Sequence, residues 1–184
     1  AGMVFAENQA LRWIADLADL PASAGGCFVT GGTMGNLSAL VTARHDAAEK
    51  QAAIGRQRPD RWAVVAAESA HSSVDSAARV MDVDVVLAAI DGDRRLRGDA
   101  VAEAIMNRPA GTEVFAVNAT AGTTNLGIVD DLDGVATACS EFGVWLHVDG
   151  AYGGAAMAAP SVRYRFDGIE RCDSLVVDPH KWLF

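Results

Sequence analysis

Short apolar runs that alternate with segments of helical composition are the feature that most constrains the fold of this chain. The apolar runs are WAVVAA (62–67), VDVVLAAI (83–90), VFAVNA (114–119), VWLHVD (144–149) and SLVVD (174–178). Segments of helical composition between them include DAVAEAIMNR (99–108) and DLDGVATACSEFG (131–143). This alternation predicts an α/β fold, a mostly parallel sheet with helices on both faces. Ligands of such sheets bind at the carboxyl ends of the strands, so functional residues are expected where the apolar runs end.

The N-terminal part of the chain predicts a helix, a strand and a second helix. Residues 3–19 place apolar side chains at mostly three- and four-residue spacings until Pro21, which indicates an amphipathic helix. CFVT (27–30) is expected to form a strand that ends at a glycine turn, and residues 34–53 have helical composition. The sequence contains no internal repeat, low-complexity tract or linker, so residues 1–184 are interpreted as one domain.

Charge and hydropathy exclude several kinds of partner. Fifteen Lys and Arg against 24 Asp and Glu give a net charge of −9, which argues against a nucleic-acid partner. The one basic cluster, residues 56–61, contains a proline and an aspartate and is interpreted as a solvated loop. The apolar stretches are far shorter than the ~18 to 20 residues of a membrane helix, so no membrane partner is expected.

The cysteines and the first residues indicate a reduced, cytoplasmic protein. Cys27, Cys139 and Cys172 are odd in number and widely spaced, without a CxxC pair or a nearby histidine at ligand spacing. Neither disulfides nor a metal site are therefore expected. The N-terminus contains acids and lacks the basic start and cleavage site of a secretory signal.

Three candidate site segments follow predicted strands, and none of them decides the function alone. Gly32 and Thr33 precede a helix, where free N–H groups can bind a phosphate, although a plain tight turn is an equally good interpretation. His71 follows the strand 62–67 and would bring an imidazole to the same edge, but a single histidine is more often structural. Thr120 follows the strand 114–119 in a Thr- and Gly-rich stretch that also suits an ordinary loop.

Asp149 is more informative because it ends an apolar strand and is followed by GAYGG. A carboxylate after a buried run needs a partner, since an isolated buried charge is unfavourable. Asp149 would either cap the next turn or face a cationic ring nitrogen. In the second case, the small residues after it would leave space for a flat cofactor.

The last apolar strand ends in DPHKW and presents His180 and Lys181 beside Trp182. A lysine in an apolar environment has its charged form disfavoured, and the neutral amine is the form that attacks an aldehyde. A surface lysine is the alternative interpretation of any single lysine. A lysine next to His and Trp after a buried strand favours a reactive amine.

Five motifs in this order, TGGTMGN, ESAHSSV, NATAGTTNLGIVDDL, WLHVDGAYGG and DSLVVDPHKW, resemble those of the group II pyridoxal-phosphate-dependent amino-acid decarboxylases. This family includes the aromatic-amino-acid, histidine, glutamate and 2,4-diaminobutyrate enzymes. The resemblance implies the large domain of the type I, aspartate-aminotransferase-like fold, with pyridoxal 5'-phosphate (PLP) as the cofactor. It also implies a lyase that converts an L-amino acid to the corresponding amine and CO2 through a quinonoid intermediate.

The resemblance assigns roles to individual residues. Lys181 would carry the cofactor as a Schiff base, the internal aldimine, and Asp149 would pair with the pyridinium nitrogen. His71 would stack on the ring from the face opposite Ala151, and these three, Lys181, Asp149 and His71, would be the catalytic residues. The full set of expected cofactor-binding residues is Gly32, Thr33, His71, Thr120, Asp149, Ala151, His180 and Lys181. Among them, Thr120 would lie near the polar ring substituents, and Gly32, Thr33 and His180 would lie near the phosphate.

The family pattern extends beyond the chain in both directions. Relatives continue past the position of Phe184 with a mobile loop and a small C-terminal domain, and they carry an N-terminal segment that helps to form a dimer. The resemblance therefore implies that residues 1–184 are an internal fragment of the large domain and that the full-length protein is a homodimer.

Two alternatives and the choice of substrate stay open. One alternative is an aldehyde synthase or carbon-carbon lyase of the same fold, and the other is a catalytically inactive PLP-binding relative. Aromatic, acidic and diamino acids all remain candidate substrates, because the sequence has no charged group that can be placed against a substrate side chain.

Overall fold

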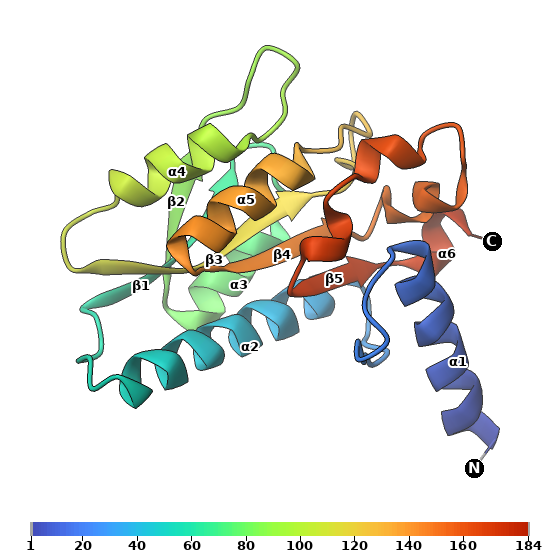
Figure 1. Cartoon of the computed structure of the whole chain (residues 1–184), viewed down its shortest axis with the longest axis horizontal. Coiled ribbons are helices and arrows are strands. Elements are labelled where there is room, and N and C mark those ends of the chain that lie inside the picture. Colours follow the sequence, from blue (N-terminus) through green and yellow to red (C-terminus); the bar gives the residue numbers. More distant parts are fainter. Residues whose placement is uncertain (1, 184) are drawn as a thin grey trace.

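The computed structural model describes residues 2–183 and contains a five-stranded parallel sheet (Figure 1). The strands are β1 (Arg61–Ala67), β2 (Asp84–Ala88), β3 (Thr112–Thr120), β4 (Trp145–Gly150) and β5 (Ser174–Val177). Their order across the sheet is β2-β1-β3-β4-β5, and every neighbouring pair is parallel. The α/β fold expected from the alternating apolar runs is confirmed.

The α-helices lie between the strands and at both ends of the described chain. They are α1 (Gly2–Leu17), α2 (Gly32–Ala53), α3 (Ser73–Met81), α4 (Gly98–Met106), α5 (Leu132–Phe142) and α6 (Pro179–Trp182). Three short 3-10 helices, Gly154–Ala158, Arg163–Phe166 and Ile169–Arg171, connect β4 to β5. Helices α1, α2, α4 and α5 form where the sequence pattern predicts them, and α3 and the short α6 lie outside the expected set.

The helices cover both faces of the sheet, as Figure 1 shows: α2 and α3 pack on one face, and α4 and α5 on the other. This arrangement follows from the apolar strands, whose successive side chains point to opposite faces. Along β4, Leu146 and Val148 belong to the apolar core shared with α4 and α5. His147 and Asp149 point the other way and both make hydrogen bonds with Asn36 of α2.

The prediction of a strand at CFVT (27–30) is wrong. These residues form an irregular segment, and the side chains of Phe28 and Val29 are exposed. A strand requires a hydrogen-bonding partner, and within residues 2–183 the edge strand β5 pairs only with β4. The glycine turn that follows does form, and α2 begins at Gly32.

The basic cluster, the cysteines and the helices each bear on an expectation from the sequence. The basic cluster 56–61 is an irregular segment until Arg61 begins β1. Cys27, Cys139 and Cys172 are all free thiols. None of the helices in the described part of the chain is both long enough and apolar enough to cross a membrane.

Candidate active site

An open cavity of about 640 Å³ lies at the carboxyl ends of β1, β3, β4 and β5. The eight site residues expected from the sequence all line it: Gly32, Thr33, His71, Thr120, Asp149, Ala151, His180 and Lys181. They come from segments as far apart as the start of α2 and the end of the described chain. The parallel sheet brings them together, because the carboxyl ends of parallel strands meet at one edge.

The N-terminus of α2 opens into this cavity and can bind an anion. Gly31 precedes the helix with a φ of 95°, a left-handed conformation that favours glycine, and no side chain caps the helix. A Cβ added to Gly32 would lie 2.9 Å from the Cβ of Ala151, so a larger residue would not fit there. Gly32 and Thr33, the first two residues of this 22-residue helix, line the cavity, an arrangement suited to a phosphate group.

Asp149 is a buried carboxylate held by two neutral donors. Its side chain lies at the end of β4, and the residue is 5% exposed. Oδ2 accepts a hydrogen bond from Nδ2 of Asn36 at 2.8 Å, and Oδ1 accepts one from the backbone N–H of Ala151 at 3.0 Å. No Lys, Arg or His among residues 2–183 forms an ion pair with it. A buried carboxylate in this setting suits a ligand that brings its own cation, such as a protonated ring nitrogen.

Behind Asp149 lies a cluster of buried polar side chains that sequence reasoning missed. Nε2 of His147 lies 3.0 Å from Oδ1 of Asn36, and Nδ1 of His147 lies 2.8 Å from Oγ of Ser174. Burial lowers the pKa of His147 to about 4, with the negative charge of Asp149 acting in the opposite direction. One sequence feature could have found this residue: in HVD, His147 stands two positions before Asp149 and so points to the same face of the strand.

His71 is held at the cavity by Ser73, the first residue of α3. Nδ1 of His71 accepts the backbone N–H of Ser73 at 3.2 Å and lies 2.8 Å from its Oγ. The proton of a neutral His71 ring is therefore on Nε2. Thr120 reaches the cavity from the end of β3, where it is buried.

Lys181 and His180 share one carboxylate, that of Asp178. Nζ of Lys181 lies 3.5 Å from Oδ2 of Asp178, and Nδ1 of His180 lies 2.8 Å from Oδ1. The Lys181 side chain is 35% exposed, whereas that of Asp178 is only 10% exposed. The prediction of an apolar environment for Lys181 is therefore wrong, because the Asp178 carboxylate at the end of β5 lies beside its amine. Apolar contact is instead made by the neighbouring Trp182, whose ring packs edge-on against Tyr152 at a centroid distance of 5.6 Å.

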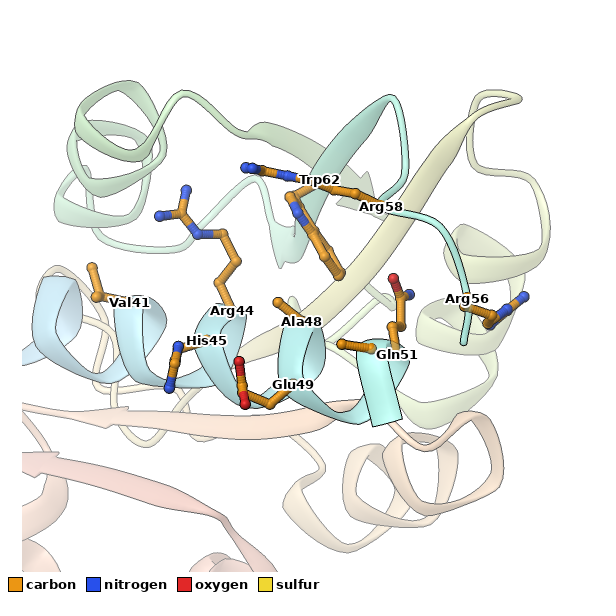
Figure 2. Close-up of a pocket in the computed structure, with 10 residues that line it drawn as sticks. Val41, Arg44, His45, Ala48, Glu49, Gln51, Arg56, Arg58 and Trp62 are labelled. Atoms are coloured by element: carbon orange, nitrogen blue, oxygen red, sulfur yellow. The ribbon is translucent and has the colours of Figure 1, made fainter. Parts of the chain in front are cut away.

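A second cavity, of about 540 Å³, lies at the opposite end of the strands (Figure 2). It is bounded by the C-terminal half of α2 and the segment that leads into β1, with Trp62 on one side. Arg44, which lines it, donates to the carbonyl oxygen of Met81 at 2.7 Å. None of the residues expected to be catalytic lines this cavity, so it is not the candidate active site.

The model of the family described as "Pyridoxal-dependent decarboxylase conserved domain" matches residues 3–184. The chain therefore belongs to the pyridoxal-dependent decarboxylase family. This finding confirms the family expected from the motifs, and the pyridoxal dependence in the family's description agrees with the expected cofactor.

Curated relatives agree with this assignment. The chain is 37% identical to an aromatic-L-amino-acid decarboxylase of Bacillus atrophaeus, over 100% of this chain and 38% of the relative. It is also 37% identical to an L-2,4-diaminobutyrate decarboxylase of Rhizobium meliloti (strain 1021), over 97% of this chain and 35% of the relative. The chain thus spans well under half the length of these relatives.

Solved structures show the same fold. Mouse CSAD in apo form aligns with a TM-score of 0.89 and 32% identity, over 98% of this chain and 39% of that chain. Oryza sativa TDC with PLP and tryptamine aligns with a TM-score of 0.85 and 34% identity, over 96% of this chain and 39% of that chain. These neighbours confirm the expected type I fold of the large domain.

Proposed function

We propose that this chain is the cofactor-binding part of an enzyme that uses PLP to convert an L-amino acid to the corresponding amine and CO2. The observation that carries the proposal is the meeting of Lys181, the Asp149 carboxylate and the N-terminus of α2 in one cavity. Each of these groups matches one part of the cofactor: the amine matches the aldehyde, the carboxylate the ring nitrogen, and the N–H groups the phosphate. Similarity to several amino-acid decarboxylases supports the proposed reaction.

Bound PLP supplies a ring that accepts the electrons left at the substrate Cα when its carboxylate departs as CO2. Lys181 would hold the cofactor through its Nζ, and formation of the amine would require a proton at Cα in place of the departing carboxylate. Asp178, beside Lys181, fixes the position of the lysine before the cofactor binds.

Among the cavity residues, Asp149 is proposed to contribute most to the rate of decarboxylation. Its carboxylate is proposed to keep the ring nitrogen protonated, so that negative charge moves toward a cation as the carboxylate leaves. Hydrogen bonds from Asn36 and from the N–H of Ala151 fix the direction of the Asp149 carboxylate. Such stabilisation is largest while the charge develops, so Asp149 affects rate more than binding.

The remaining cavity residues position the cofactor. His71 and Ala151 are proposed to contact opposite faces of the ring, and Thr120 is proposed to contact its polar substituents. Gly32 and Thr33, with His180, are proposed to hold the phosphate at the start of α2. Their common location in the cavity and the free N–H groups of the first turn of α2 support these roles.

The first experiment maps the covalent attachment. The full-length protein is loaded with PLP, reduced with borohydride, digested and analysed by mass spectrometry. The chain contains two lysines, and Lys50 serves as an internal control because it is exposed and paired with Asp46. We expect the pyridoxyl group on Lys181 and not on Lys50. A reduced protein with an unmodified Lys181 would refute the proposed site.

The second experiment identifies the product. The loaded protein is incubated with aromatic, acidic and diamino L-amino acids, and CO2, amine and aldehyde are measured together. We expect CO2 and amine in equal amounts. Aldehyde as the main product would favour the aldehyde-synthase alternative, which is supported by similarity to a Rhodiola rosea 4-hydroxyphenylacetaldehyde synthase (TM-score 0.83, 28% identity). A modified Lys181 without turnover of any amino acid would indicate an inactive PLP-binding relative.

We also propose that residues 1–184 are part of a longer large domain and that the full-length protein is a cytoplasmic homodimer. Exposed apolar side chains on α1, including Met3, Phe5 and Trp13, support burial of this helix against further chain. The three free thiols support a reducing compartment. Light scattering after size-exclusion chromatography tests the dimer, because a monomeric mass at micromolar concentration would contradict it.

A further inference from the structure

A chain of hydrogen bonds connects the edge strand of the sheet to Asp149. Nε1 of Trp145 donates to Oγ of Ser174 at 2.8 Å, and that hydroxyl lies 2.8 Å from Nδ1 of His147. Nε2 of His147 lies 3.0 Å from Oδ1 of Asn36, whose Nδ2 donates to Oδ2 of Asp149 at 2.8 Å. His147 is fully buried and Asn36 is 1% exposed. The connection therefore runs from β5 through β4 and α2 to the cavity.

The direction of these hydrogen bonds follows from the chemistry of the carboxylate. An ionised carboxylate only accepts hydrogen bonds, so the Asn36 amide turns its NH2 group toward Asp149 and its oxygen toward His147. That oxygen requires a proton on Nε2 of His147, which leaves Nδ1 of the neutral ring to accept the hydroxyl proton of Ser174. The buried, neutral ring meets this requirement. Every donor in the connection thus points toward Asp149.

We propose that Asn36 and His147 are positioning residues that hold the Asp149 carboxylate in place and direct it at the ring nitrogen of bound PLP. This inference rests on the function proposed above and goes beyond it, since that function assigns no role to His147 and none to Asn36 beyond its hydrogen bond to Asp149. Neutral donors suit the role. They orient the carboxylate without placing a second cation beside it, and they leave further lone pairs of both oxygens free for the ring N–H.

The same amide also reaches the histidine that is proposed to stack on the ring. Nδ2 of Asn36 donates to Oγ of Ser73 at 2.8 Å, and this hydroxyl lies 2.8 Å from Nδ1 of His71. Because Ser73 accepts from Asn36, its own hydroxyl proton is available to Nδ1 of His71. One side chain of α2 thereby holds both Asp149 and, through Ser73, His71.

The chain offers a matched control for Asn36. Asn118 lies directly opposite His147 in the register of β3 and β4, on the same face of the sheet, and is also 1% exposed. Neither its side-chain nitrogen nor its oxygen has a hydrogen-bond partner among the described residues. Replacing Asn36 or Asn118 with leucine removes the same amide at the same depth of burial, but only Asn36 donates to Asp149.

The test compares Asn36→Leu with Asn118→Leu in the full-length protein. The dissociation constant of PLP is measured by absorbance titration, and kcat and KM are measured by CO2 release. The protonation of the ring nitrogen is read from the 15N chemical shift of bound, ring-labelled PLP. A purely structural role of Asn36 would leave this chemical shift unchanged. The pair His147→Gln and His147→Leu gives an independent test, because glutamine keeps a donor near the position of Nε2 and leucine does not.

We expect Asn36→Leu to weaken PLP binding about tenfold and to lower kcat about tenfold or more, with KM changed less than about threefold. The 15N shift should move toward that of an unprotonated ring. Asn118→Leu should stay within about twofold of the wild type in all three quantities, and His147→Gln should retain more activity than His147→Leu.

One outcome would overturn this inference and leave the proposed function intact. In it, the wild type binds PLP and releases CO2, and Asn36→Leu matches Asn118→Leu in PLP affinity, kcat and 15N chemical shift. If Asn36→Leu does not fold, equal effects of His147→Gln and His147→Leu would overturn it. A wild-type protein that takes up no PLP would overturn the proposed function together with this inference.

Discussion

Thr120 and Asp130 hold each other by two reciprocal hydrogen bonds. The backbone N–H of Thr120 donates to Oδ2 of Asp130 at 2.7 Å, and the backbone N–H of Asp130 donates to the carbonyl oxygen of Thr120 at 3.0 Å. Oδ1 of Asp130 also accepts the backbone N–H of Leu96 at 2.8 Å. These bonds close the loop 121–129, which contributes residues 122–125 to the cavity. Burial raises the pKa of Asp130 to about 6, although these N–H donors oppose the shift.

We expect Asp130→Ala to destabilise the fold by about 1 to 3 kcal/mol, measured by urea unfolding at pH 5. Alanine has no side-chain acceptor, so the buried N–H groups of Thr120 and Leu96 would both lose their partner. Asp93→Ala is a suitable control because Asp93 is exposed. Equal stability of wild type and Asp130→Ala would contradict the structural role of the carboxyl group.

The pH dependence of the same variant has a defined sign. The pKa of Asp130 is about 6 in the folded protein and about 3.8 in the unfolded chain, so the folded state binds more protons between these values. The stabilising contribution is fully present below about pH 4 and is lost as the pH rises through about 6. The stability of the wild type relative to Asp130→Ala should therefore fall between pH 4 and pH 7, by on the order of 3 kcal/mol. A difference that stays constant over this range would contradict the raised pKa.

His147 should show the opposite pH dependence. Burial lowers its pKa from 6.5 to about 4, so the folded state binds fewer protons than the unfolded chain. Its contribution to stability is present above about pH 6.5 and is lost as the pH falls toward 4. We expect His147→Gln to be less sensitive to acid than the wild type in this interval, measured by thermal unfolding at closely spaced pH values. A stability profile of His147→Gln that runs parallel to that of the wild type over this pH range would contradict a buried neutral imidazole.

Asp149→Ala should separate cofactor binding from catalysis. The variant loses the carboxylate proposed to face the ring nitrogen but keeps Lys181 and the N-terminus of α2, so we expect it to retain some PLP. Decarboxylation should be nearly abolished, since the stabilised charge develops during the reaction. Borohydride trapping on Lys181 checks the first expectation, and CO2 release checks the second. Turnover at the wild-type rate would refute the role of Asp149.

Gly98 should be intolerant of even a methyl group. A Cβ added there would overlap the backbone carbonyl of Gly134, at the contact between α4 and α5. We expect Gly98→Ala to lose about 1 to 3 kcal/mol of stability, because neither backbone can move away cheaply in a packed core. Gly92→Ala is the control, since a Cβ at Gly92 meets no atom within 4 Å. Denaturant midpoints of the two variants test the difference, and similar midpoints would disprove the close contact.

The residues that meet in the cavity could be predicted because they stand at or just after the ends of predicted strands. His71, Thr120, Asp149 and Lys181 each stand at or shortly after the carboxyl end of a predicted strand, and a parallel sheet gathers such positions at one edge. The strands themselves could be predicted because each contains a short apolar run. The inner strands β1, β3 and β4 are buried on both faces, whereas the edge strands β2 and β5 are only partly buried.

The surroundings of these residues could not be predicted in the same way. Asn36 and Asp149 are 113 positions apart, and their contact depends on how far α2 reaches along the sheet, which local periodicity does not encode. The environment of Lys181 depends on the direction of the Asp178 side chain. CFVT has strand-like composition, yet a strand also needs a partner, and composition does not show whether one is available.

Substitutions on the two faces of β4 should have different effects on this protein. Leu146 and Val148 serve only the apolar core shared with α4 and α5, whereas His147 and Asp149 form the polar network next to the cavity. Alternate positions of one strand are therefore under separate selection. Changes at Leu146 and Val148 should lower the amount of folded protein in a cell. Changes at His147 and Asp149 should leave protein that accumulates but works poorly, so a scan of every substitution that records abundance and activity would divide the strand by odd and even positions.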